Sequence, residues 1–300
     1  SPSMSPGGVS VNKYVGDFIK TEVDNYLHKN PLVAEVMLQK IQDSEKERKA
    51  IAGVTKLARE RAKKANLHNR KLRDCRYHLN DGKGKDQETE SCIFITEGDS
   101  ASGSITKSRD VNTQAVFSLR GKPLNSYGLT KKVVYENEEF NLLQAALNIE
   151  DGIEGLRYNK VIAATDADVD GAHIATLLLT FFYRFYPDLI SEGHIYIAIP
   201  PLYRVGEGKN IKYLYSDDEL AKYRKTHTNK FTIQRYKGLG EMDADQLYET
   251  TMNPETRLLK QVSVNSRVEA NQLTQTLMGT EVAPRREYIE THSADAVLDI

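Results

Sequence analysis

Residues 166–171 contain the strongest local signal for chemistry in the chain. Asp166, Asp168 and Asp170 alternate with apolar residues, and Gly171 follows directly. Three carboxylates this close repel one another, which costs stability unless a cation neutralises them. Hard oxygen ligands suit Mg²⁺, which commonly joins carboxylates to phosphates. The spacing therefore predicts a divalent-metal site, and the simpler alternative is an acidic turn that caps the next helix.

A fourth carboxylate, Glu97, completes the candidate site. An apolar run at residues 161–164 precedes the aspartates, and another at 92–95 precedes Glu97. Ligand sites in open α/β sheets lie beyond the carboxyl ends of the strands. If the two strands are neighbours, Glu97 and the aspartates converge on one acidic pocket. An ordinary strand-to-helix turn with Asp99 or Ser100 as N-cap is the alternative.

Two other metal or phosphate sites resemble the aspartate cluster. Residues 166–171 match positions 1, 3, 5 and 6 of an EF-hand loop, but position 12 is Leu177 rather than glutamate, so that interpretation fails. A strand ending in Asp-x-Asp is also typical of phosphatases with an aspartyl nucleophile, and this alternative stays open on the motif alone. The chain contains no G-x-G-x-x-G or Walker A motif, so nucleotide binding has little support.

The elements around these acids alternate between strands and helices. Apolar runs predict buried strands at residues 92–95, 116–119, 161–164 and 194–199, and helical spacing predicts helices at 140–147 and 174–186. We therefore expect an α/β fold with a mainly parallel sheet. Helices are also predicted at 11–27 and from Pro31 to about Leu72, before a polar linker at 80–90. The C-terminal third mixes strands at 213–215 and 231–234 with helices at 244–252 and 270–278.

Composition limits the class of protein. The chain has 300 residues, 39% of them hydrophobic and 28% charged, and it holds no run of about 18 uncharged apolar residues and no basic start followed by an apolar core. The sequence therefore predicts neither a membrane span nor a secretory signal. Two cysteines, Cys75 and Cys92, are too few for a disulfide framework or a four-cysteine zinc site. A cytoplasmic protein is expected.

Charge is unevenly distributed. Residues 44–85 hold 14 Lys/Arg and five Asp/Glu, a net charge of +9, so the rest of a chain of net charge −1 carries −10. A basic segment beside an acidic body predicts a polyanionic partner, and a solvated helix face is the simpler explanation.

Several motifs follow one another in order between about Leu72 and Ile300. They are EGDSA at 97–101, LRGK at 119–122, TDADVDG at 165–171, LLLTFFY at 177–183, PPLY at 200–203, QRYKGLGEM at 234–242 and PRR at 284–286. Together these motifs resemble the Toprim region of bacterial type IIA topoisomerase B subunits. The EGDSASGS variant at 97–104, Arg120 and the compact C-terminal third are more similar to the topoisomerase IV type of B subunit than to gyrase B, where lysine is usual at the position of Arg120.

The resemblance implies roles for the matching residues. Glu97, Asp166 and Asp168 would bind Mg²⁺, for which Mn²⁺ or Ca²⁺ can substitute, and Asp170 would support them or act as a ligand. Glu97 and Asp166 would hold the ion nearest the scissile phosphate, and Asp166 with Asp168 a second ion. The DNA contacts would be Arg120, Lys122 and Lys237. Contacts to quinolones would come from Asp99 and Arg120, and His173 would orient the acids from outside the ligand shell, although a helix-capping role fits it equally well.

The resemblance also predicts domains and partners. We expect a disordered or tag-like start at 1–10, the helical end of a transducer and a basic linker at 11–85, a Toprim domain at 90–205 and a C-terminal α+β region at 206–300. The family's ATPase domain is not expected in this sequence. ATP would therefore act on the whole enzyme only through that domain and would not bind this chain. Double-stranded DNA and an A subunit, in an A2B2 complex, are the expected partners of a cytoplasmic, nucleoid-associated enzyme.

The implied function is double-strand DNA cleavage and religation during ATP-dependent decatenation, relaxation or supercoiling. The A subunit would supply the nucleophilic tyrosine, so none is expected among the 16 tyrosines of this chain, which alone should be inactive. Two other functions remain open: a stand-alone Toprim nuclease or primase, and a DNA-binding and subunit-docking module without chemistry of its own.

Overall fold

The computed structural model describes residues 11–66, 71–227 and 230–296. The chain forms two compact units, residues 1–56 and 57–300. The predicted disordered start at 1–10 lies outside the described residues. Within those residues, no helix has both the length and the apolar character needed to cross a membrane.

The first unit consists of helical segments, as the sequence predicted. Asn30 separates helix α1 (Val11–Lys29) from helix α2 (Pro31–Asn66), and α2 continues beyond this unit. Pro31 suits the first position of a helix because its missing N–H would have no partner there. Many apolar side chains of α1 and the first turns of α2 are exposed, including Phe18, Ile19 and Val36.

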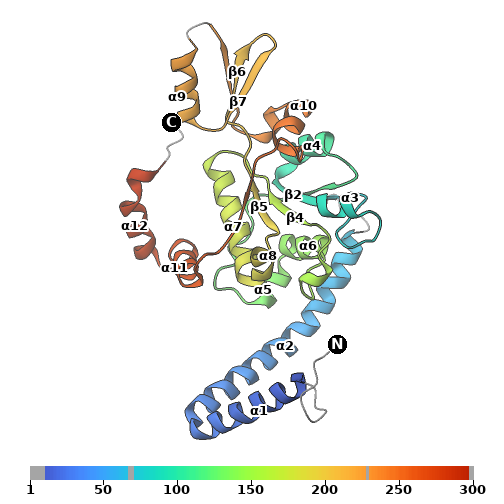
Figure 1. Ribbon diagram of the computed structural model, residues 1–300, viewed down its shortest axis with the longest axis vertical. Coiled ribbons are helices and arrows are strands. Elements are labelled where there is room, and N and C mark those ends of the chain that lie inside the picture. Colours follow the sequence, from blue (N-terminus) through green and yellow to red (C-terminus); the bar gives the residue numbers. More distant parts are fainter. Residues whose placement is uncertain (1–10, 67–70, 228–229, 297–300) are drawn as a thin grey trace. The chain divides into compact units, whose positions relative to one another are not determined.

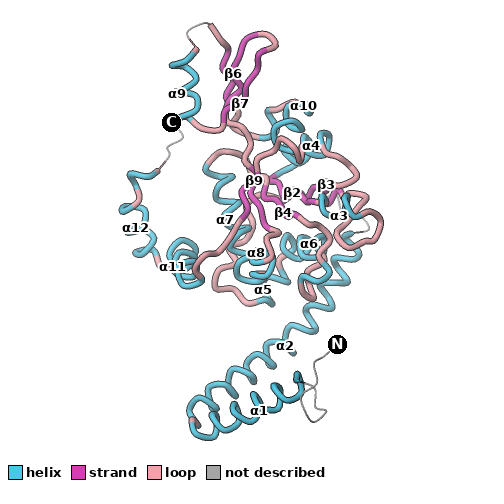
Figure 2. The backbone as a smooth tube through the Cα atoms, in the orientation of Figure 1, coloured by secondary structure: helices cyan, strands magenta, loops and turns pink. Residues whose placement is uncertain are grey.

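The second unit is built on a six-stranded sheet with the order β1-β3-β2-β4-β5-β9. Figures 1 and 2 show its neighbouring strands β2 and β4 in the interior of this unit. The four inner strands pair in parallel, and β1 and β9 pair antiparallel at the edges. The predicted mainly parallel sheet is therefore confirmed. The strands are β1 (Leu72–Arg73), β2 (Cys92–Glu97), β3 (Gln114–Leu119), β4 (Lys160–Ala163), β5 (Ile195–Ala198) and β9 (Leu259–Gln261).

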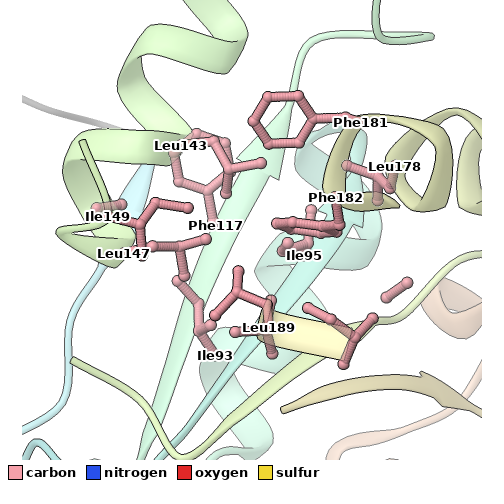
Figure 3. Packing of buried hydrophobic residues seen from close by; sticks show 14 of the residues in the cluster. Ile93, Ile95, Phe117, Leu143, Leu147, Ile149, Leu178, Phe181, Phe182 and Leu189 are labelled. Carbon is pink, nitrogen blue, oxygen red and sulfur yellow. The ribbon is translucent and has the colours of Figure 1, made fainter. Parts of the chain in front are cut away.

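Alternating side chains of the inner strands enter two separate cores. On one face, Ile93, Ile95 and Phe117 pack against helices that include α6 (Glu138–Leu147) and α7 (Val169–Phe185), as Figure 3 shows. On the other face, strand residues such as Phe94 pack against α4 (Gly98–Ser108) and the loop that contains Leu239. Both faces of the sheet are covered, which explains why these strands read as continuous apolar runs.

The remaining helices of this region are short. They are α3 (Lys85–Glu90), α5 (Lys131–Glu136), α8 (Pro187–Ser191) and a 3₁₀ turn at Ile153–Gly155.

Further elements follow β5. A three-stranded antiparallel sheet has the order β7-β6-β8, and Leu220 of α9 packs with its apolar residues. Helix α11 is docked on the main body by hydrogen bonds from Asn125 to Met278 (2.9 Å) and from Tyr183 to Asn271 (2.7 Å). The elements are β6 (Tyr203–Glu207), β7 (Asn210–Leu214), α9 (Asp217–Thr226), β8 (Thr232–Arg235), a 3₁₀ turn (Leu239–Glu241), α10 (Ala244–Leu247) with a π turn (Tyr248–Met252), α11 (Arg267–Met278), α12 (Val282–Thr291) and a 3₁₀ turn (Ser293–Asp295).

Several local predictions were wrong. The helix expected to reach Leu72 has its last described residue at Asn66, residues 67–70 lie outside the described chain, and Leu72 pairs with Phe117 in the sheet. The predicted linker ends in a helix, α3. Asp99 and Ser100, the alternative N-cap residues, lie inside the first turn of α4, and Glu97 is the N-cap residue. The short edge strands β1 and β9, the central strand β6 of the small sheet and helix α12 were not predicted, because short strands and polar helices lack a strong apolar period.

Asp74 joins the segment after β1 to the segment before β4. Its carboxylate accepts hydrogen bonds from the Tyr158 hydroxyl (2.6 Å), the His78 ring (2.9 Å) and Arg157. Burial alone would raise the pKa of Asp74, but these hydrogen bonds and the charge of Arg157 outweigh it, so the pKa is lowered. Ionised Asp74 therefore stabilises the fold.

We predict that Asp74→Asn lowers the free energy of unfolding at neutral pH by roughly 1 to 2 kcal/mol, a value that allows for the side chain's contact with water. The stabilisation from Asp74 is fully present above its unfolded pKa of about 4 and is lost as the pH falls through the lower folded value. The difference between wild type and variant should therefore shrink in acid. Urea unfolding between acidic and neutral pH measures this, with exposed Glu136→Gln as the control. An equal difference at every pH would contradict it.

Candidate metal centre

The carboxylates predicted from the sequence lie at the ends of two neighbouring strands. β2 pairs in parallel with β4, with Ile95 opposite Ala163. Glu97 is the last residue of β2, and Asp166 follows β4 after two residues. Helices α4 and α7 begin at these acids, so their N-terminal ends face negative charge, which is favourable. The two strands are thus adjacent, as the hypothesis of one acidic pocket required.

The electrostatics of Glu97 indicate that the acids form one cluster. Partial burial raises the pKa of Glu97, and the negative charges of Asp166, Asp168 and Asp170 raise it further, while Lys122 acts in the opposite direction. Ionising Glu97 therefore costs free energy in the folded chain. A bound divalent cation would remove that cost, and carboxylate oxygens are the ligands that Mg²⁺ prefers. The donor set fits such an ion.

Asp168 is held by the helix that follows it. It is the N-cap residue of α7, and its Oδ1 accepts a hydrogen bond from the backbone N–H of Gly171 at 2.7 Å. Gly171 itself packs closely: a Cβ atom there would lie 2.0 Å from the carbonyl oxygen of Asp166. Glycine is therefore required for the tight turn that places the two aspartates.

Asp166 contacts a segment that is distant in sequence. Its Oδ1 accepts a hydrogen bond from the backbone N–H of Leu239 at 2.9 Å. The motif at residues 234–242 suggests Lys237 as a DNA contact, but it gives no sign of this bond. Lys237 is exposed, and its own backbone N–H donates to Glu241 (3.0 Å).

Lys122 and His173 face the outer edge of the cluster. Lys122 Nζ lies 2.6 Å from Asp170 Oδ1, and both side chains are exposed. The hydrogen bond with Asp170 raises the pKa of Lys122 and lowers that of Asp170. His173 lies in the first turns of α7, where the positive charge of its protonated ring also lowers the pKa of Asp170.

Asp99 and Arg120 line a second, neighbouring surface. Both are exposed, and both border an open pocket of about 910 Å³ together with Lys71, Arg73 and Lys107. Glu138 also lines this pocket, so four of its six charged side chains are cationic and the pocket favours anionic groups.

Another group of potential ligands lies away from this centre. Asp74, Cys75 and His78 bring one ligand atom each within 4.8 Å of one another. Burial and the negative charge of Asp74 raise the pKa of Cys75 to about 12, so its thiol stays protonated. Arg157 already pairs with Asp74. A metal ion would need the Cys75 thiolate, which does not form, and the Asp74 carboxylate, which already pairs with the Arg157 guanidinium. This cluster is therefore structural.

Two family models match the chain. The model described as Toprim domain matches residues 92–200, which include all four acids. The model described as DNA gyrase B subunit, carboxyl terminus, matches residues 228–290.

Curated relatives match almost the whole chain. The DNA gyrase B subunit of Thermus thermophilus is 44% identical over 298 residues, covering 95% of this chain and 45% of that protein. The DNA topoisomerase 4 B subunit of Borreliella burgdorferi is 41% identical over 283 residues, covering 94% and 47%. The DNA gyrase B subunit of Spiroplasma citri is 44% identical over 294 residues, covering 94% and 44%. The chain thus spans about half the length of the relatives it matches.

Proposed function

The chain belongs to the B-subunit family of bacterial type IIA topoisomerases, and from that premise we propose that its Toprim domain binds Mg²⁺ and supports double-strand DNA cleavage and religation. In this proposal the A subunit of an A2B2 complex supplies the nucleophilic tyrosine. The whole enzyme would couple the reaction to ATP hydrolysis through a separate domain, in a cytoplasmic, nucleoid-associated setting. The features at 97–104 and Arg120 favour the topoisomerase IV type.

The observation that supports this function best is the repulsion that the three aspartates after β4 exert on Glu97 at the end of the neighbouring strand β2. Glu97 and Asp166 would bind the ion nearest the scissile phosphate, and Asp166 with Asp168 a second ion. Bound metal stabilises charge on the attacking and leaving oxygens of a phosphodiester. Asp170 would hold Lys122 beside the site until DNA competes for the lysine, and His173 would help to orient Asp170.

Two alternatives are less well supported. A stand-alone Toprim nuclease or primase would not need the gyrase B carboxyl-terminal region that matches residues 228–290. A DNA-binding and docking module without chemistry would not need carboxylates that repel one another at the strand ends. Mixing the chain with an A subunit and scoring Mg²⁺-dependent double-strand breaks separates all three functions.

We predict that Asp168→Asn reduces Mg²⁺-dependent cleavage at least about tenfold in the complex with the A subunit, because it removes a ligand charge. Asparagine caps a helix about as well as aspartate, so folding should be retained, whereas Asp168→Ala would also lose the cap. Cleavage is measured across a Mg²⁺ titration, and thermal unfolding is the control. If the Asp168→Asn variant cleaved DNA as well as the wild type at limiting Mg²⁺, the assignment of Asp168 as a ligand would be contradicted.

We predict that DNA binding without divalent metal weakens steeply as salt rises, because Arg120, Lys122 and Lys237 neutralise phosphates. Lys122→Ala should lower the slope of log K against log salt by about 0.9 and weaken binding to all sequences alike. Asp170→Asn should do the opposite and strengthen binding, since it releases Lys122 and removes a negative charge. Fluorescence anisotropy across a salt series measures both effects. A flat salt response, or two variants that shift affinity in the same direction, would count against these contacts.

We predict that Asp99→Asn alters quinolone-stabilised breakage while Mg²⁺-dependent religation is largely retained. Asp99 is exposed in the same pocket as Arg120, and the substitution removes one negative charge at its rim without touching the acidic cluster. Cleavage assays with and without drug make the comparison, and Arg120→Lys tests the geometry of the second contact, since lysine lacks the planar donor fork. Complete loss of drug-free cleavage in Asp99→Asn would refute the assignment.

A further inference from the structure

The loop at residues 236–242, here called the strap loop, is fixed against the sheet by its apolar side chains. Tyr236, Leu239 and Met242 are 2%, 1% and 5% exposed, and they pack in the same core as Phe94 and Ile162. Because Phe94 and Ile162 belong to β2 and β4, the backbone of the loop is held on the two strands that end at the acids.

This backbone touches one acid directly. The N–H of Leu239 donates to Asp166 Oδ1 at 2.9 Å. Gly238 lies against the rest of the carboxylate: a Cβ atom on Gly238 would be 3.0 Å from Oδ2 and 3.2 Å from both Cγ and Oδ1.

The conformation of Gly238 does not explain why it is glycine. Its backbone is extended, with φ −142° and ψ 156°, which any residue can adopt. The contact with Asp166 does explain it, because a methyl group at this point would press on three atoms of the carboxylate at once.

We propose that Gly238 and Leu239 are positioning residues for the metal centre, through Asp166. The Leu239 amide fixes one carboxylate oxygen, and the absence of a side chain at Gly238 lets the whole carboxylate lie close against the backbone of the loop. This proposal rests on the proposed metal-binding function. Partners that orient a ligand from outside the coordination shell typically change metal affinity by about 10- to 100-fold when they are mutated.

The test compares two glycine substitutions in the strap loop. Gly238→Ala should weaken Mn²⁺ binding to the full chain about tenfold or more, measured by calorimetry. Gly240→Ala is the matched control: its Cβ would come closest to the hydroxyl of exposed Ser100, at 2.9 Å, and that hydroxyl can rotate away. In an Asp166→Asn background Gly238→Ala should have little further effect, because the two residues act through one contact.

A second measurement needs no metal. Hydrogen exchange of the Leu239 amide should be slow in the wild type and in Gly240→Ala, and its protection should be lost in Gly238→Ala and Asp166→Ala. Melting temperatures confirm that each variant is folded.

The outcomes separate the two proposals. If the wild type binds Mn²⁺ and Gly238→Ala binds it equally well, or if both glycine variants lose affinity alike, the positioning role is overturned and the metal site stands. If the wild type binds no Mn²⁺, the proposed function fails, whether or not the Leu239 amide is protected.

Discussion

Repulsion between carboxylates at the ends of two adjacent strands is the constraint on which the rest of the site depends. Parallel pairing of β2 with β4 brings Glu97 into the field of the aspartates, and the pKa of Glu97 rises because of burial and those charges. At neutral pH this arrangement costs folding free energy. Two helix N-termini, one lysine and the proposed metal ions are the groups that offset it.

Asp166 and Asp168, the proposed ligands of the second ion, are each oriented by a backbone N–H. Asp168 accepts from Gly171, and Asp166 accepts from Leu239. Each of these bonds engages the Oδ1 atom of its aspartate and restricts side-chain rotation before any ion binds. Orientation in advance lowers the entropic cost of forming the site.

The cations are organised around the same acids. Lys122 pairs with Asp170 although both are exposed, an arrangement that water screens and that a phosphate could replace at little cost. Lys237 precedes the glycine that touches Asp166, so a DNA contact there would lie on the loop that also orients a ligand. The proposed DNA contact at Lys237 is therefore joined to the proposed metal centre by a short stretch of backbone.

The sequence by itself determined the parallel sheet, its inner strands and the acids at their ends, because continuous apolar runs and clustered charges are local signals. It also contained the family's motifs in order, which the comparisons confirm as a relationship. Only the tertiary structure decided that Leu239, 73 residues after Asp166, donates to it, and that Asp74 joins two loops through Tyr158. Both contacts link segments that are distant in sequence. The first uses a backbone N–H, which every residue except proline possesses, and the second uses side chains whose spacing in the sequence has no recognisable pattern. Edge strands such as Leu72–Arg73 escaped prediction for a related reason, since two residues hold no period and their pairing with β3 exists only in the folded sheet.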